Sequence, residues 1–154
     1  MYRIGLISDT HGLLRPEVLA FLQGCDHIVH GGDIGDPQIL VQLAGLAPLT
    51  AVRGNNDVGA WADAVPAAAR VELVGLRLYV IHDLAELKID PAAEGVRVVV
   101  CGHSHRPKAE ERAGVWYVNP GSAGPPRFRL PISAAELRVD DGAVTPQLVE
   151  LVKR

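Results

Sequence analysis

Cysteine is scarce in this sequence, and no apolar run is long. Two cysteines, Cys25 and Cys101, stand far apart among 154 residues, so a disulfide-stapled secreted domain is not expected. The longest uncharged stretch, residues 37–52, falls short of the about 20 residues that cross a bilayer. The apolar N-terminal run meets Asp9 too early for a secretion signal, whose apolar part spans about 7–15 residues. We therefore expect a cytoplasmic protein with no membrane association.

Positive charge is not in excess either. The chain carries 15 Lys and Arg against 18 Asp and Glu, a formal net charge of −3. This balance argues against stable nucleic-acid binding and against attraction to anionic membranes. A small anionic substrate would need a local source of positive charge. With 48% hydrophobic residues the chain can bury one core, and we expect a single domain over residues 1–154.

Apolar runs alternate with helical patterns in the first third of the chain. Residues 2–8, 27–30 and 50–53 have the composition of strands, and residues 15–23 and 37–46 have apolar positions at helical spacing. Later strands are predicted at 71–74, 77–81, 96–101 and 115–119, followed by a terminal hairpin of 134–139 and 144–152. These patterns predict an α/β fold with two packed mixed β-sheets flanked by helices.

Five polar clusters directly follow predicted strands, at the position where open α/β sheets bind ligands. They contain Asp9 and His11; Asp33; Asn55, Asn56 and Asp57; His82; and the pair His103 and His105. Each cluster alone has a structural alternative: a carboxylate that caps a turn, an asparagine-rich turn, or a histidine that packs or faces solvent. His30 either orients a carboxylate or is a buried, hydrogen-bonded histidine.

Taken together, the clusters are more specific than any one of them. Four of the six histidines, two aspartates and an asparagine lie at the ends of successive strands. One metal ion takes about four to six ligands from protein and water, so seven protein donors indicate two divalent ions that share a carboxylate. Nitrogen and oxygen donors without thiolate suit Mn²⁺, Fe, Zn²⁺, Co²⁺ or Ni²⁺ better than Ca²⁺. We take Mn²⁺ as the first expectation.

The order and spacing of these residues resemble the motifs D-x-H, G-D, G-N-x-D, H and G-H-x-H of the calcineurin-like metallophosphoesterases. The resemblance spans roughly residues 4–127, and it is strongest to the small bacterial and archaeal phosphodiesterases of that family. It implies the family's four-layer sandwich. It also implies a first metal held by Asp9, His11, Asp33 and His105, and a second held by Asp33, Asn55, His82 and His103, with Asp33 bridging.

The resemblance further implies a small phosphoester substrate, most of all a phosphodiester, and in-line attack on phosphorus by a metal-bridged hydroxide. Asn56 stands where many members have a histidine that aids the leaving group. It can stabilise a phosphoryl oxygen but has no readily ionised proton, so we predict a preference for good leaving groups. Arg127 either faces the substrate phosphate or forms a surface salt bridge. Asp83, where the family often has glycine, either tunes His82 or faces solvent.

A non-catalytic, metal-binding scaffold for protein interactions is the alternative function. The retromer subunit that shares this fold resembles such a scaffold, because it has lost a metal-site histidine and carries phenylalanine at the position of Asn56. Every ligand position of the present chain carries a competent donor, which favours the enzyme. The natural substrate and self-association into a homo-oligomer are left open by the sequence.

Overall fold

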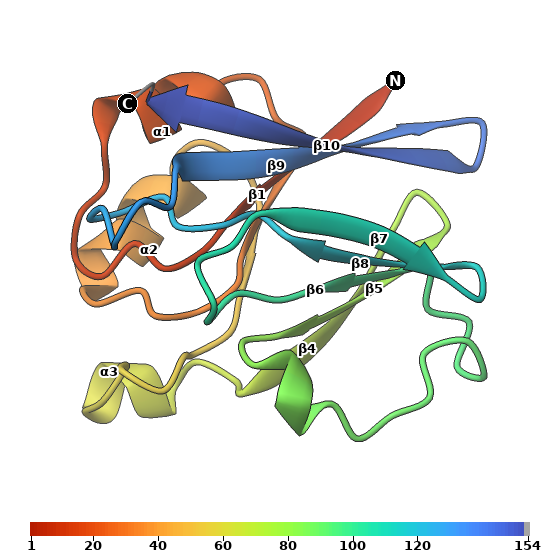
Figure 1. The fold of residues 1–154 in the computed structure, drawn as a ribbon, viewed down its shortest axis with the longest axis horizontal. Coiled ribbons are helices and arrows are strands. Elements are labelled where there is room, and N and C mark those ends of the chain that lie inside the picture. The colour runs from red at the N-terminus through yellow and green to blue at the C-terminus, as the bar shows by residue number, and fades with distance from the viewer. Residues whose placement is uncertain (153–154) are drawn as a thin grey trace.

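Two five-stranded sheets pack face to face in this protein (Figure 1). The structure is a computed structural model, and it describes residues 1–152. Within that range, no helix is long and apolar enough to span a membrane.

The first sheet has the strand order β10-β9-β1-β2-β3. Strands β1 (Tyr2–Ile7), β2 (His27–His30) and β3 (Leu49–Ala51) run parallel, joined by helices α1 (Pro16–Leu22) and α2 (Pro37–Ala44). The terminal hairpin of β9 (Ile132–Asp140) and β10 (Ala143–Val152) pairs antiparallel with the other side of β1. The predicted β-α-β-α-β order and the terminal hairpin are both confirmed.

The second sheet has the order β4-β5-β6-β8-β7. Strands β5 (Leu76–Ile81), β6 (Val98–Val100) and β8 (Val115–Asn119) are parallel, and β4 (Ala68–Leu73) and β7 (Lys108–Arg112) are antiparallel edge strands. Strand β7 was not predicted, because its sequence KAEER lacks the apolar alternation of a strand. The short helix α3 (Ala60–Asp63) and the 3₁₀ turn η1 (Leu84–Glu86) were not predicted either.

Successive side chains of β1 point to opposite faces of the sheet and therefore contribute to two different core layers. Ile4 and Leu6 face the second sheet, whereas Ile7 faces the layer that contains α1 and α2. Gly5 also faces the helices, where a β-carbon would lie 2.5 Å from Leu22 Cδ2. The absence of a side chain at Gly5 therefore lets α1 pack closely on the sheet.

The parallel strands determine where polar side chains can gather. In both sheets they run in one direction, so their carboxyl ends meet at one side of the molecule, on the left in Figure 1. The loops that follow β1, β2, β3, β5 and β6 carry the five polar clusters.

Candidate metal centre

The structure brings all seven predicted ligand side chains into one connected cluster. In the first half, Asp9 Oδ1 lies 3.3 Å from His105 Nε2 and 3.7 Å from His11 Nε2. The two histidine Nε2 atoms are themselves 3.3 Å apart. Such a separation of two imidazole nitrogens beside a carboxylate suits a shared cation, since each nitrogen can offer it a lone pair.

The second half of the cluster lies around Asp33 and Asn55. Asp33 Oδ2 is 3.3 Å from His82 Nε2, and Asn55 Oδ1 is 3.1 Å from both His82 Nε2 and His103 Nδ1. Asp33 Oδ2 also lies 3.7 Å from His11 Nε2, so this oxygen faces both halves. Its location between histidines of the two halves is what a bridging carboxylate requires.

One buried atom tests whether this set of residues fits a metal. Asp9 is fully buried, and its Oδ1 has no hydrogen-bond partner within the described chain. The other carboxylate oxygen, Oδ2, accepts from the Ser8 hydroxyl at 2.7 Å and from the His103 N–H at 3.1 Å. An unpaired buried carboxylate oxygen is unfavourable by itself, and a cation among the surrounding imidazoles would satisfy it. The donors present therefore fit divalent metal ions.

Backbone strain is concentrated at the same residues. Five of the seven candidate ligands have φ in the left-handed region: Asp9 at 56°, His11 at 47°, Asp33 at 56°, His103 at 73° and His105 at 63°. For a residue other than glycine, this conformation is unfavourable by about 1–2 kcal/mol. Strained backbone of this kind clusters at functional sites, where the surrounding structure holds it in place. The fold thus maintains an arrangement that local preference opposes.

Close backbone approach explains the glycines that flank the ligands. A β-carbon on Gly54 would collide with the Asp33 carboxylate, and one on Gly102 would collide with the Ser8 hydroxyl. Gly32 has a φ of 103°, and a β-carbon there would meet the His82 ring. Glycine is therefore required where the loops pass each other.

Asp57 joins the loops that carry the ligands, a role that its place in the sequence did not predict. Its buried carboxylate accepts hydrogen bonds from the N–H groups of Ile34 at 3.1 Å, Gly35 at 2.9 Å and Gly54 at 2.9 Å. The loop after β2 and the loop after β3 are thereby held together. The fourth position of G-N-x-D was the available signal, since a carboxylate in a tight turn often accepts from backbone N–H groups.

His30 supports the loops around the metal centre through hydrogen bonds, and it contacts no carboxylate in the part of the chain that the structure describes. The Gly32 N–H donates to His30 Nδ1 at 3.0 Å, and Nε2 lies 3.0 Å from Thr10 Oγ1. Thr10 in turn donates to the Ile34 carbonyl at 2.9 Å. Burial lowers the pKa of His30 to about 4, although nearby carboxylates work to raise it. His30 is therefore a buried, neutral, hydrogen-bonded histidine, and it does not orient a carboxylate.

The ionisation of Asp33 and His82 is coupled. Burial alone would raise the pKa of Asp33, but hydrogen bonding to His82 and to the Asn56 N–H lowers it to about 2. Burial opposes the charged form of His82, yet the hydrogen bonds to Asp33 and to the Gly31 carbonyl raise its pKa above the usual value. Asp33 is thus a carboxylate at neutral pH, the form that binds a cation.

Comparison with known proteins agrees with this geometry. A family model described as a calcineurin-like phosphoesterase superfamily domain matches residues 2–142. The chain belongs to this superfamily. A probable metallophosphoesterase of Methanothermobacter thermautotrophicus is 32% identical over an alignment of 158 positions, gaps included, that covers 95% of this chain and 91% of the relative.

Solved structures share the fold of this calcineurin-like phosphoesterase domain. Vps29 from Chaetomium thermophilum superimposes with a TM-score of 0.74 at 23% identity, over 97% of both chains. Yfce, a phosphoesterase from E. coli, gives a TM-score of 0.68 at 24% identity, over 97% of this chain and 100% of Yfce. At these identities the likeness establishes the two-sheet fold alone.

The structure places Asn56 and Arg127, the two predicted substrate contacts of this superfamily member, differently. Asn56 lies beside the bridging candidate: its N–H donates to Asp33 Oδ1 at 2.9 Å and its side-chain amide to Asp33 Oδ2 at 3.1 Å. Arg127 is exposed, and no hydrogen bond joins its side chain to any of the seven candidate ligands. Its segment is nevertheless anchored near the centre, because Gly124 packs on Thr10 and accepts from Arg15 Nε at 3.0 Å.

Asp83 faces His103 rather than His82. Its Oδ2 is 3.8 Å from His103 Nε2, while Oδ1 accepts from the Ala85 N–H at 3.0 Å. Because His103 Nδ1 points to Asn55, the carboxylate is on the outer side of the ring. A carboxylate beside the outer nitrogen of a ligand histidine orients its ring.

Proposed function

We propose that this protein is a metal-dependent phosphodiesterase that hydrolyses small phosphodiesters at a centre for two divalent cations, with Mn²⁺ as the first expectation. The single observation that carries the proposal is the buried, unpaired Asp9 Oδ1, with Nε2 atoms of His105, His11 and His82 at 3.3, 3.7 and 3.9 Å. When bound, two such cations supply Lewis acidity toward the phosphoryl oxygens and lower the pKa of a water molecule.

The donor geometry supports the division of ligands that the family resemblance implies. Asp9, His11, Asp33 and His105 would hold the first cation, and Asp33, Asn55, His82 and His103 the second. The two sets meet at Asp33 Oδ2, which lies 3.7 Å from His11 Nε2 and 3.3 Å from His82 Nε2. Two groups of three donors lie close enough together to hold one ion each. Asp9, His11 and His105 fall within the first set, whereas Asp9, Asp33 and His82 draw on both sets.

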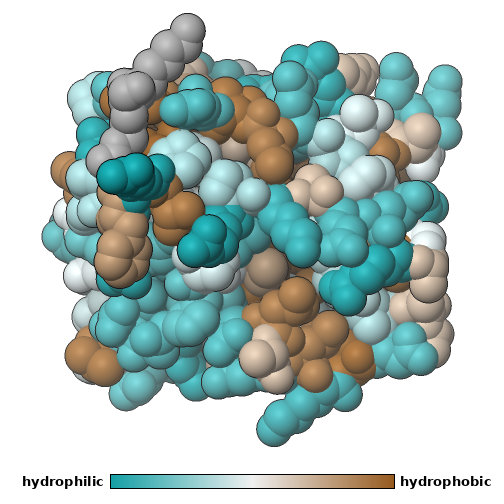
Figure 2. Space-filling model, in the orientation of Figure 1, coloured by the Kyte–Doolittle hydropathy of each residue, from teal (hydrophilic) through white to brown (hydrophobic). Residues whose placement is uncertain are grey.

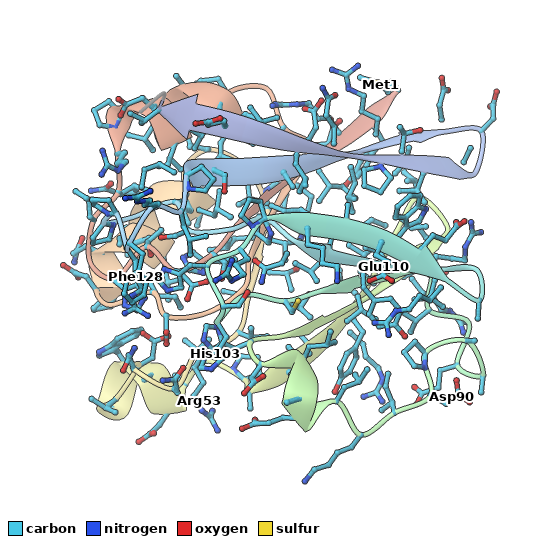
Figure 3. All side chains as sticks on the ribbon, viewed as in Figure 1. Met1, Arg53, Asp90, His103, Glu110 and Phe128 are labelled. Atoms are coloured by element: carbon cyan, nitrogen blue, oxygen red, sulfur yellow. The ribbon has the colours of Figure 1, made fainter. Side chains whose placement is uncertain are left out.

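Access to the centre favours a substrate with two ester groups. The His103 side chain is 46% exposed, whereas Asp9 is fully buried, so a substrate approaches from the side of His103. One cleft of about 260 Å³ lies between Arg53, His82 and His103, and a second of about 300 Å³ lies between His103, Cys101 and Tyr117. Figure 3 shows His103 and Arg53 near each other at the end of the sheets where the strands terminate. A phosphodiester bound at His103 can extend one ester group into each cleft.

The residues of the chain itself have three roles in this proposal. His103 and Asn55 border the open side of the metal centre, where the substrate phosphate would lie. The Asn56 side-chain amide, 3.1 Å from Asp33 Oδ2, holds that carboxylate and is a neutral donor for a phosphoryl oxygen. No ionisable acid stands at position 56, so an ester with a good leaving group is the expected substrate.

A scaffold without turnover is the weaker proposal. Such a role does not require a complete donor set, and all seven ligand positions of this chain carry a nitrogen or oxygen donor. It also gives no reason for the left-handed backbone at five of them.

The proposal is tested with metal-free protein reloaded with Mn²⁺. We expect hydrolysis of bis(p-nitrophenyl) phosphate that exceeds hydrolysis of p-nitrophenyl phosphate, together with two bound manganese ions per chain by elemental analysis. Asp33→Ala should abolish the activity and reduce the bound metal, whereas Asp63→Ala, an exposed aspartate of α3, should change neither. Equal activity of the Asp33 variant and the parent protein would refute the shared site, and stoichiometric metal without hydrolysis would favour the scaffold.

A further inference from the structure

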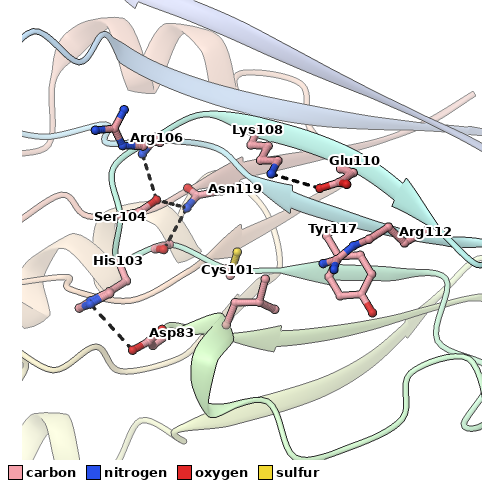
Figure 4. A pocket seen from close by; sticks show the side chains of 12 residues that line it. Asp83, Cys101, His103, Ser104, Arg106, Lys108, Glu110, Arg112, Tyr117 and Asn119 are labelled. Atoms are coloured by element: carbon pink, nitrogen blue, oxygen red, sulfur yellow. Dashed lines mark hydrogen bonds and ion pairs between the residues drawn. The ribbon is translucent and has the colours of Figure 1, made fainter.

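The second cleft beside His103 is a cavity on the outer face of the second sheet, which we call the β7 cavity. It has a volume of about 300 Å³, at the lower end of the range for small-ligand sites. Figure 4 shows it extending from His103 at one end to Tyr117 and Arg112 at the other, with Cys101 between them. It therefore begins at the metal centre and extends away from it along the sheet.

Strand alternation explains why cationic side chains line one wall. Ala109 of β7 packs into the core between the sheets, so Lys108, Glu110 and Arg112 project from the opposite face. Arg106, in the preceding loop, also lines the cavity. The segment that contains η1 covers part of this face but stops short of β7. The missed strand β7 thus supplies the charged wall.

The floor of the cavity is apolar. Leu84, Cys101 and the Tyr117 ring line it. Cys101 is buried, and none of these three side chains carries a carboxylate or an amine. Figure 2 shows a hydrophobic area on this face, next to the hydrophilic side chains along β7. A planar apolar group fits such a floor better than a sugar or a polar chain.

Among the charged side chains of the wall, two arginines remain available to bind a ligand. Lys108 and Glu110 form an ion pair at 3.1 Å, and Asp83 faces His103 at the metal end. The Arg112 guanidinium lies 4.1 Å from the centroid of the Tyr117 ring, which fixes its position without neutralising its charge. The Arg106 guanidinium has no carboxylate partner among residues 1–152. An anion at the far end of the cavity would therefore meet Arg112.

We propose that the β7 cavity binds one ester group of the substrate, and that this group is a planar apolar group with a terminal anion, either a carboxylate or a phosphate. The assignment rests on the phosphodiesterase function proposed above and specifies its substrate class. The metal centre holds the reacting phosphate, the floor contacts the planar group, and Arg112 binds the terminal anion as a charge-assisted hydrogen-bond donor.

Two substrates that differ only in the terminal anion test the proposal: p-nitrophenyl phenyl phosphate and p-nitrophenyl 4-carboxyphenyl phosphate. We expect kcat/KM of the carboxylate substrate to exceed that of the phenyl substrate by about 5- to 10-fold, mainly through a lower KM. In Arg112→Gln this ratio should fall to about one. Arg70→Gln is the matched control, because Arg70 lies over the Tyr79 ring in the same way, on the opposite edge strand. It should keep the parent ratio.

A binding measurement without metal separates this proposal from the proposed activity. Metal-free protein is titrated with benzoate and followed by the NMR amide signals of Cys101, Arg112 and Tyr117. We expect saturable shifts that benzyl alcohol does not produce and that Arg112→Gln weakens by at least fivefold. Shifts of equal strength in Arg112→Gln, or none in the parent protein, would overturn the anion site. Arg112-dependent binding in a protein that hydrolyses neither diester would support the site and overturn the phosphodiesterase.

Discussion

His105 Nε2 lies 3.3 Å from Asp9 Oδ1, a fully buried carboxylate oxygen that no hydrogen bond satisfies within the described residues. Without a bound cation this arrangement is unfavourable, because the charge is desolvated and only partly compensated. The same pair offers a cation one oxygen and one nitrogen donor. The contact therefore links metal binding directly to the stability of the fold.

Replacing Asp9 by asparagine tests this link. In Asp9→Asn the side-chain amide can donate to His105 and no buried charge remains, so the metal-free protein should gain about 1 kcal/mol in free energy of unfolding. In parallel, the stabilisation that Mn²⁺ confers on the parent protein should be largely lost, since it depends on preferential binding to the folded state. Urea unfolding with chelator and with Mn²⁺ measures both effects. A variant that is less stable without metal, yet stabilised by Mn²⁺ like the parent protein, would contradict the interpretation.

Replacing Asp57 should lower the free energy of unfolding as much as truncating an apolar core residue. Asp57→Ala leaves three backbone N–H groups without an acceptor, two of them buried, and we expect a loss of about 3 kcal/mol in free energy of unfolding. Asp57→Asn retains one acceptor oxygen and should lose roughly half as much. Urea unfolding of metal-free protein checks the order of the three proteins. Equal stability of the alanine and asparagine variants would show that the hydrogen bonds do not determine the effect.

These residues also show what the sequence could predict. The β-α-β-α-β order and the seven candidate ligands follow from apolar runs and from the polar residues after them. Strand β7 could not be predicted, because its stability comes from antiparallel pairing with β8 and not from its own polar sequence. The contact between Asp83 and His103 was equally hidden, since it depends on how the loops after β5 and β6 pack, which no local pattern encodes.

The pH dependence of stability should carry the signature of His30. Its folded-state pKa of about 4 lies below the ordinary 6.5, so the unfolded chain takes up a proton first as the pH falls. The contribution of neutral His30 is complete above pH 6.5 and is lost between pH 6.5 and 4, by roughly 3 kcal/mol in total. The raised pKa of His82 acts in the opposite direction, because its contribution is lost as the pH rises.

Comparison with His30→Asn isolates this contribution. Asparagine can accept from the Gly32 N–H but does not titrate, so the variant should be less stable than the parent protein near pH 7. The difference between the two free energies of unfolding should shrink as the pH falls to 4. Urea unfolding at each pH, with chelator present because metal binding is itself pH-dependent, gives the difference. A constant difference across this range would mean that His30 is not held neutral by the fold.

Position 56 should control which leaving groups the enzyme accepts. Asn56 keeps Asp33 in place through its N–H and its side-chain amide but has no proton to give to a departing alkoxide. Asn56→His keeps the backbone contact and adds a general acid, a group that commonly contributes about 10²–10⁴-fold. We expect Mn²⁺-loaded Asn56→His to hydrolyse methyl p-chlorophenyl phosphate at least tenfold faster than the parent protein, with a much smaller gain on methyl 2,4-dinitrophenyl phosphate.

The slope of log kcat against leaving-group pKa separates general acid catalysis from a simple change in binding. In the parent protein the slope should be steep, because the leaving group departs without protonation. It should flatten in Asn56→His and remain steep in Asn56→Gln, which retains an amide. If the slope of the histidine variant matched that of the parent protein, the residue would act by positioning Asp33 alone, and leaving-group preference would have to come from the two clefts at His103.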